Sequence, residues 1–236
     1  MKSFLWLIGI FIIGCSTAVQ KEVEIQPVAV GQKFHAAFLI SEGVYNSELM
    51  APFDIFQHTV FHTDGGIEVF TVAEQMDTIV TFEGLRLIPD YAFDSEELPA
   101  IDILVVPSAE HHLDSDLENE HLINFVSEKG KEALYVMSLC DGAFVLAKAG
   151  LVQDQISTTF PSDIPAYKEK FPELEVIEEV SFVHDGKLLT SAGGAKSYDV
   201  ALYLVHYLYG EDVAKGVGKG LVIDWDLNDY AFKIAE

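Results

Sequence analysis

The stretch that most constrains the fold is 133–147, which reads ALYVMSLCDGAFVLA. Its first seven residues are almost all apolar, the pattern of a strand buried on both faces of a sheet. The run stops at Cys140-Asp141-Gly142, and a helical pattern begins at Ala143. A strand that turns directly into a helix needs close backbone approach, which glycine allows. The pattern therefore predicts a nucleophile elbow that raises the Cys140 side chain above the sheet edge.

Two interpretations of Cys140 are open at this point. The N-terminus of the following helix carries a partial positive charge, which favours a thiolate. A free cysteine is, however, often only a small buried hydrophobe.

The N-terminal segment has the features of a signal peptide for export. Segment 3–13 is apolar, too short to span a bilayer and of the length of a signal-peptide hydrophobic region. It runs into Gly14-Cys15-Ser16, which resembles the lipoprotein box, where cleavage precedes a lipidated cysteine. We expect a signal peptide over 1–14, lipidation at Cys15 and a tether over 15–33. The alternatives are an ordinary signal peptide or an uncleaved anchor helix.

This interpretation predicts a location and isolates one thiol. With serine after Cys15, we expect a bacterial envelope protein, lipid-anchored at the periplasmic face of the outer membrane. The chain has two cysteines, so Cys140 would be the one thiol of the mature domain, with no disulfide partner. A lone thiol kept in an oxidising compartment is either well buried or chemically useful.

The charge limits the partners. Lys plus Arg number 14 against 38 Asp plus Glu, a formal net charge of -24. Such a surface repels phosphate backbones and anionic lipid headgroups. We expect a small-molecule partner, no nucleic acid, and membrane contact through the lipid anchor alone.

Segments with strand and helix patterns alternate over 34–236, which we take as one domain. Strand patterns fall at 34–40, 67–73, 101–106, 133–139, 156–160 and 174–179; hairpins at 78–93 and 180–191; helices at 48–58, 117–129, 143–148, 162–171, 196–209 and 211–218. We expect Pro52 to disturb the first turn of its helix and Gly130 to end another. This alternation predicts an α/β fold, a doubly wound, mostly parallel sheet whose site lies at the carboxyl ends of the strands.

Several motifs occur in a familiar order. They are the elbow at 139–147 followed by Ala149-Gly150-Leu151 and Thr158-Thr159, the segment Thr190-Ser191-Ala192-Gly193, and Glu48 to Phe56. Together they resemble the ThiJ/PfpI family of the class I glutamine amidotransferase-like, flavodoxin-like fold. The nearest branch includes isonitrile hydratases and the amidotransferase-like domains of regulators. The resemblance covers about Phe34 to Trp225.

The resemblance implies that Cys140 is a nucleophile and that Glu48 is the acid beside it. A carboxyl group that hydrogen-bonds the sulfur can hold or shuttle its proton. The alternative is that Glu48 is a solvated residue in a first helical turn. The family commonly dimerises near its first helix, so we also expect a homodimer.

Two departures from the family concern the base. Phe160 stands where the family often has histidine, and Asp141 stands where protease-like members carry histidine. Asp141 could raise the pKa of Cys140, donate a proton, or cap the following helix. The cap is our default expectation.

A third departure is Pro107-Ser108-Ala109, in place of Pro-Gly-Gly. The Ala109 amide could still bind an oxyanion, although alanine does not freely adopt positive φ. His111 and His112 follow in a loop expected to overhang Cys140, where either could replace the missing base. The alternative is two exposed loop histidines.

Two functions remain open. One is a cysteine-dependent hydrolase or hydratase acting on a small electrophile, with proton transfer by Glu48 and Asp141. The other is a non-catalytic module that senses stress through Cys140 oxidation or binds a ligand. We expect no cofactor, and the histidines show no metal-ligand spacing.

Overall fold

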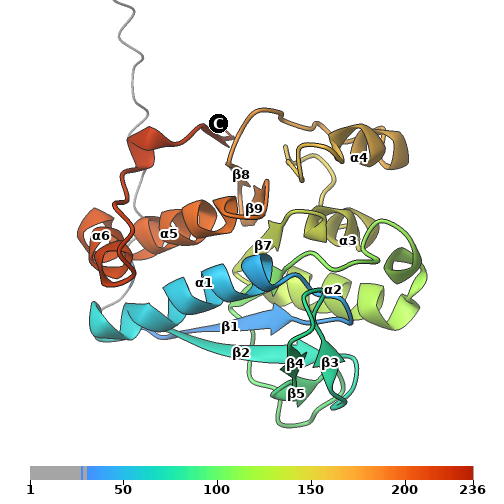
Figure 1. Ribbon diagram of the computed structural model, residues 1–236, viewed down its shortest axis with the longest axis horizontal. Helices are drawn as coiled ribbons and strands as arrows, with labels where there is room; N and C mark the ends of the chain where they lie inside the picture. The colour runs from blue at the N-terminus through green and yellow to red at the C-terminus, as the bar shows by residue number, and fades with distance from the viewer. Residues whose placement is uncertain (1–27, 29–30, 236) are drawn as a thin grey trace, which may run out of the picture.

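The structure, a computed structural model, describes residue 28 and residues 31–235 (Figure 1). The expected signal peptide, Cys15 and most of the expected tether lie outside the described residues. Within the described part of the chain, no helix combines the length and the apolarity needed to cross a bilayer.

One eight-stranded sheet forms the centre of the fold, in the order β10-β8-β9-β7-β6-β1-β2-β5. Its strands are β1 (Phe34–Leu39), β2 (Ile67–Ala73), β5 (Tyr91–Ala92), β6 (Ile103–Val106), β7 (Tyr135–Leu139), β8 (Phe182–Asp185), β9 (Leu188–Ser191) and β10 (Phe232–Ile234). All neighbouring strands pair in parallel except β8 and β9. A separate hairpin joins β3 (Ile79–Val80) to β4 (Arg86–Leu87).

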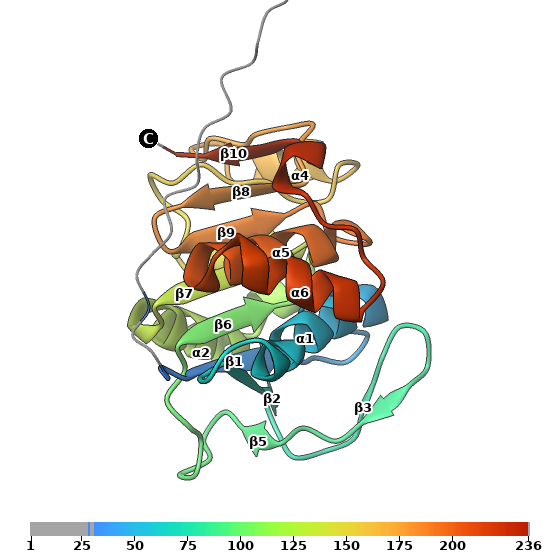
Figure 2. The same ribbon diagram turned by 90° about the vertical axis from the view of Figure 1, so that its left-hand side faces the viewer.

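Helices cover both faces of the sheet. In Figure 2, α1 (Asn46–His58), α5 (Lys196–Tyr209) and α6 (Glu211–Gly220) lie in front of it. The other face carries α2 (Glu120–Glu132), α3 (Gly142–Lys148) and α4 (Ile164–Lys170), and each face has its own hydrophobic core. Short 3-10 turns are η1 (Thr59–Phe61), η2 (Ser115–Glu118) and η3 (Leu227–Asp229). The doubly wound α/β fold expected from the sequence is confirmed. Central strands such as β6 are buried along their whole length, and such strands need helices on both faces of the sheet.

Several local expectations were wrong. The helix expected to stop at Gly130 continues to Glu132. A β-carbon at Gly130 would lie 2.3 Å from Leu151 Cδ1, so this glycine serves close packing and does not end the helix. Helix α1 begins at Asn46, two residues earlier than expected, so Pro52 falls in its second turn and the helix continues through it.

The region beyond the elbow also differs from the expectation. Segments 156–160 and 174–179 are not strands and share only an isolated bridge between Ser157 and Val176. The C-terminal tail, in which no pattern was found, adds β10 beside β8.

Candidate active site

Cys140 lies at a strained turn between β7 and α3. Its φ is 53°, in the left-handed region that costs a residue other than glycine about 1–3 kcal/mol. The amide of Cys140 donates to the Ser191 carbonyl at 2.9 Å. The Thr159 hydroxyl donates to the Cys140 carbonyl at 3.0 Å. Neighbouring segments therefore fix the strained elbow, whose geometry agrees with the strand-turn-helix pattern of the sequence.

Two glycines let the elbow pack this closely. A β-carbon at Gly142 would stand 2.1 Å from the Val106 carbonyl oxygen of β6. One at Gly193, where φ is +75°, would stand 2.3 Å from Cys140 Cβ. The cysteine is thus wedged between the sheet and the turn after β9, and its side chain is only 7% exposed.

The carboxyl group in contact with the sulfur belongs to Asp141. The Cys140 thiol donates to Asp141 Oδ2 with an Sγ–Oδ2 distance of 3.5 Å. The other oxygen, Oδ1, accepts from the Thr159 hydroxyl at 3.2 Å. Asp141 occupies the N-cap position of α3, but its side chain makes no capping hydrogen bond, so our default expectation of a cap was wrong. The side chain turns toward the sulfur instead.

The electrostatics place a proton on the sulfur. Burial is the main cause that raises the pKa of the Cys140 thiol, and the charges of Asp141 and Glu48 raise this pKa further. The Ser108 hydroxyl and the Asp141 amide act in the opposite direction and do not compensate. The expected preference for thiolate at the helix N-terminus is therefore overridden by burial and by two carboxylates.

Asp141 is suited to receive that proton. Burial first, and the charge of Asp163 second, raise the pKa of Asp141 from 3.8 to about 6. At neutral pH the carboxylate form of Asp141 dominates, and its affinity for a proton is close to the working range of a general base.

Glu48 is at the site but makes no hydrogen bond to the sulfur. Glu48 as a whole is 5% exposed, so the alternative of a solvated helix-surface residue was wrong. Oε1 accepts from the Gly194 amide at 2.7 Å, and Oε2 accepts from the Ser47 hydroxyl at 2.8 Å. Glu48 therefore braces the turn that packs on Cys140, and its charge reaches the thiol.

In the loop after β6, the amide of Ala109 is hydrogen-bonded within the loop. The Ala109 N–H donates to His112 Nδ1 at 3.2 Å. His112 is 1% exposed, and burial lowers its pKa to about 3, so the ring is neutral and Nδ1 accepts. The Ala109 amide proposed for an oxyanion is engaged in this structure. Neither His112 nor the exposed His111, which lies 3.5 Å from Asp114, has a hydrogen bond to Cys140.

Ser108 and Thr159 were missed as site residues by the sequence reasoning. Ser108 is fully buried, its hydroxyl has no hydrogen-bond partner within the described chain, and it acts on the pKa of Cys140. The Ser108 hydroxyl therefore lies beside the sulfur and lowers the pKa of the thiol as a hydrogen-bond donor. The sequence signal that could have identified Ser108 is the serine itself, which stands where the family pattern has glycine. Thr159 was noticed only as part of a motif, because its contact with a residue eighteen positions away has no local pattern.

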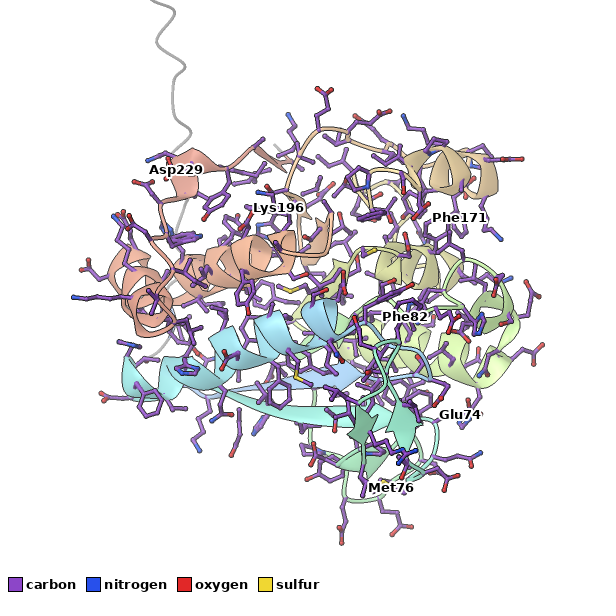
Figure 3. The ribbon with its side chains drawn as sticks, viewed as in Figure 1. Glu74, Met76, Phe82, Phe171, Lys196 and Asp229 are labelled. Carbon is purple, nitrogen blue, oxygen red and sulfur yellow. The ribbon has the colours of Figure 1, made fainter. Side chains whose placement is uncertain are left out.

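Aromatic side chains flank this region. Tyr45 and Phe82 pack with ring centroids 4.7 Å apart. Burial raises the pKa of Tyr45, and the nearby carboxylates of Glu110 and Asp141 raise it further. Figure 3 shows Phe82 near the start of α1, and its amide donates to the Val44 carbonyl at 3.0 Å. Phe160, next to Thr159, is 39% exposed. In the described part of the chain, no three His, Cys, Asp or Glu side chains are grouped to hold a metal ion.

Comparisons with known proteins identify the family of the chain. Residues 35–207 match the DJ-1/PfpI family. Isonitrile hydratase of Pseudomonas putida is 30% identical over 179 residues, which cover 75% of this chain and 73% of that protein. The HTH-type transcriptional regulator CdhR of Pseudomonas aeruginosa is 26% identical, and the match spans 54% of its length. Hence the chain corresponds to only about half of that regulator.

Solved structures share the fold. A ThiJ/PfpI family protein from Pseudomonas syringae superposes with a TM-score of 0.70 at 22% identity, over 84% of this chain and 77% of that one. Drosophila melanogaster DJ-1beta gives a TM-score of 0.68 at 19% identity, over 82% of this chain and all of that one. The protein belongs to the DJ-1/PfpI family, as the motifs of its sequence indicate.

Proposed function

We propose that this protein is a cysteine-dependent hydratase or hydrolase of small electrophiles, in which Cys140 attacks and Asp141 moves the proton. The observation that carries the proposal is the thiol-to-carboxylate contact of 3.5 Å at a strained elbow. Similarity to an isonitrile hydratase makes the terminal carbon of an isonitrile the first electrophile to test.

The chemistry balances with these groups. As the sulfur bonds to the isonitrile carbon, the thiol proton passes to Asp141 and then to that carbon, which gives a thioimidate. Water, deprotonated by Asp141, adds to the same carbon, and Asp141 returns that proton to the nitrogen. The carbon–sulfur bond then breaks, the hydroxyl proton of the adduct passes through Asp141 to the sulfur, and an N-substituted formamide leaves. The Ser108 hydroxyl is the donor available to the developing negative charge, because the Ala109 amide is already bonded to His112.

The same geometry favours an enzyme over an oxidation sensor. Oxidation to a sulfenic acid follows thiolate character and exposure. The pKa of Cys140 is raised, so peroxide would meet a protonated sulfur. A substrate that brings its own electrophilic carbon needs only a neighbouring base, which Asp141 supplies.

The test is turnover of isonitriles, amides and glyoxals by the wild type, Cys140→Ser and Ser108→Ala. We expect formamide production that is lost in the cysteine variant and lowered about 10²–10³-fold in the serine variant, the usual effect of removing one oxyanion donor. If no substrate is turned over while peroxide oxidises Cys140 stoichiometrically, the sensor is the correct function. Amide turnover without isonitrile turnover would reassign the substrate class and keep the mechanism.

Anchoring and assembly are separate proposals. We propose that Cys15 is lipidated and tethers the protein to the cell envelope; a labelled fatty acid should be incorporated by the wild type and not by Cys15→Ser. The homodimer expected from family resemblance stays a prediction, which sedimentation of the purified domain would decide.

A further inference from the structure

Tyr45 is partly exposed to solvent and is attached to the candidate active site. Its amide donates to the Ser108 carbonyl at 3.0 Å, and the hydroxyl of Ser108 acts on the Cys140 thiol. Tyr45 is also the residue from which α1 starts, and the first turn of that helix carries Glu48. The backbone of Tyr45 is therefore fixed next to the groups of the site, while part of the residue remains open to water.

The phenol of Tyr45 lies close to the reactive groups. Burial is the main cause of its raised pKa, and among its titratable neighbours Cys140 has the largest effect on this pKa, followed by Glu110, Asp141 and Glu48. Because electrostatic effects weaken with distance, the phenol lies near the thiol and near these carboxyl groups. The raised pKa keeps the phenol neutral, so a molecule that approaches the sulfur meets an uncharged ring.

Phe82 extends this aromatic surface outward from Tyr45. The two ring centroids are 4.7 Å apart and the ring planes are inclined by 37°. Phe82 is 53% exposed, and Leu85 from the same turn is 50% exposed. Figure 3 shows Phe82 beside the start of α1. Exposed apolar side chains that gather at one place on a protein commonly mark a binding surface.

The β3–β4 hairpin holds Phe82 in this position. The Phe82 amide donates to the Val44 carbonyl at 3.0 Å, and the Asn46 amide donates to Glu83 Oε2 at 3.1 Å. Val44 in turn forms a bridge with Ala109 of the loop after β6. The hairpin, the start of α1 and the loop after β6 are therefore bonded to one another around the aromatic pair. A surface that is already ordered loses little entropy when a ligand binds to it.

We propose that Tyr45 and Phe82 determine substrate specificity: their rings bind an uncharged aromatic substituent of the electrophile while its reactive carbon meets Cys140. This inference rests on the proposed function, because it names the substituent that the same site accepts. Aromatic rings attract one another in tilted and edge-to-face arrangements, so a substrate ring extends the existing pair. The carboxylates near the phenol disfavour a negatively charged substituent at the same place.

The first experiment measures binding without turnover. N-benzylformamide, N-methylformamide and N-formylglycine, the products expected from three isonitriles, are titrated into the full chain carrying Cys140→Ser and followed by NMR. We expect N-benzylformamide to shift the ring signals of Tyr45 and Phe82 and to bind at least about tenfold more tightly than the other two. Phe82→Ala in the same background should remove this preference, and Tyr45→Phe, which keeps the ring, should retain it.

The second experiment compares the turnover of benzyl isocyanide and methyl isocyanide. Phe82→Ala should raise KM for the benzyl substrate by about tenfold, leave its kcat nearly unchanged, and leave both constants for the methyl substrate unchanged. The matched control is Phe61→Ala, which removes an aromatic side chain that is 75% exposed at the opposite end of α1. This control should change neither substrate.

The two experiments distinguish this inference from the proposed function. Selective binding of N-benzylformamide at Tyr45 and Phe82 without turnover of any electrophile would overturn the proposed function and support the specificity assignment. Turnover with equal losses for both isocyanides in Phe82→Ala would give the ring a structural role and overturn the specificity assignment alone. Equal binding of the three formamides would overturn that assignment as well.

Discussion

Asp141→Asn separates the two things that this side chain does to Cys140. The carboxylate accepts the thiol hydrogen at 3.5 Å, and its charge also disfavours a thiolate. Asparagine keeps the shape and the hydrogen-bond acceptor for Thr159 but removes both the charge and the base. The variant should therefore alkylate faster and turn over substrate more slowly, two effects of opposite sign.

The magnitudes follow from the contact. Two unit charges 3.5 Å apart interact with about 5 kcal/mol at an effective dielectric constant of roughly 20, which is the upper limit for the change at the sulfur. We expect the thiol pKa to fall by at least about one unit, or about 1.4 kcal/mol, which is tenfold more thiolate at a fixed pH below that pKa. Loss of a general base should lower turnover by about 10²–10⁴-fold.

The assay measures iodoacetamide labelling of Cys140 by mass spectrometry between about pH 6 and about pH 10, a range that spans the ordinary thiol pKa. Turnover of the best panel substrate is measured over the same pH range. Asp114→Asn is the matched control, because that carboxylate is on the surface and pairs with His111. Labelling of Asp141→Asn that is equal to or slower than that of the wild type would refute the electrostatic reasoning. Unchanged turnover would remove Asp141 from the mechanism.

Three further predictions concern stability. The pKa of Asp141 is raised from 3.8 to about 6, so its favourable contribution to the free energy of unfolding is complete below pH 3.8 and is lost as pH rises through 6. Asp141→Asn should therefore raise the free energy of unfolding at pH 7 by up to about 3 kcal/mol, measured by urea unfolding, whereas a capping role predicts no increase. The pKa of His112 is lowered from 6.5 to about 3, so this residue contributes a fall in stability of up to about 1.4 kcal/mol per pH unit below 6.5, opposite in sign to the contribution of Asp141. Relative to the wild type, His112→Gln, unlike His111→Gln, should therefore gain stability as the pH falls below 6.5. Gly193→Ala should destabilise the fold by at least about 1–3 kcal/mol and slow Cys140 labelling, since φ is +75° and the new β-carbon meets Cys140; a variant as stable as wild type would contradict the packing.

The parts of the fold that could be predicted have a local signal. Helix α5 and strand β2 have the expected bounds because their apolar periodicity or strand-forming residues extend over the whole element. Strand β10 has only three residues, and its partner β8 lies about fifty positions earlier, so no window of sequence contains the pairing. Gly130 was read as a stop because glycine commonly ends helices, while its contact with Leu151 is tertiary.

The features of the candidate site also divide into those with a local sequence signal and those that depend on tertiary contacts. Cys140 could be placed because strand, turn and helix are contiguous in sequence. The direction of the Asp141 side chain depends on Thr159, and the fate of the Ala109 amide depends on the ring orientation of His112. Both are choices between competing hydrogen bonds, which residue types alone do not decide.

The departures from the family pattern make chemical sense when taken together. A histidine base at position 160 would leave no need for a carboxylate on the sulfur, and here position 160 is phenylalanine while Asp141 makes that contact. A free Ala109 amide would leave no need for a hydroxyl at position 108, and here the amide is bonded to His112 while the Ser108 hydroxyl acts on the sulfur. Each lost function thus has a neighbouring replacement within the elbow or its facing loop. This pairing supports an active site with altered proton transfer, because both replacements are buried and both act on the pKa of the Cys140 thiol.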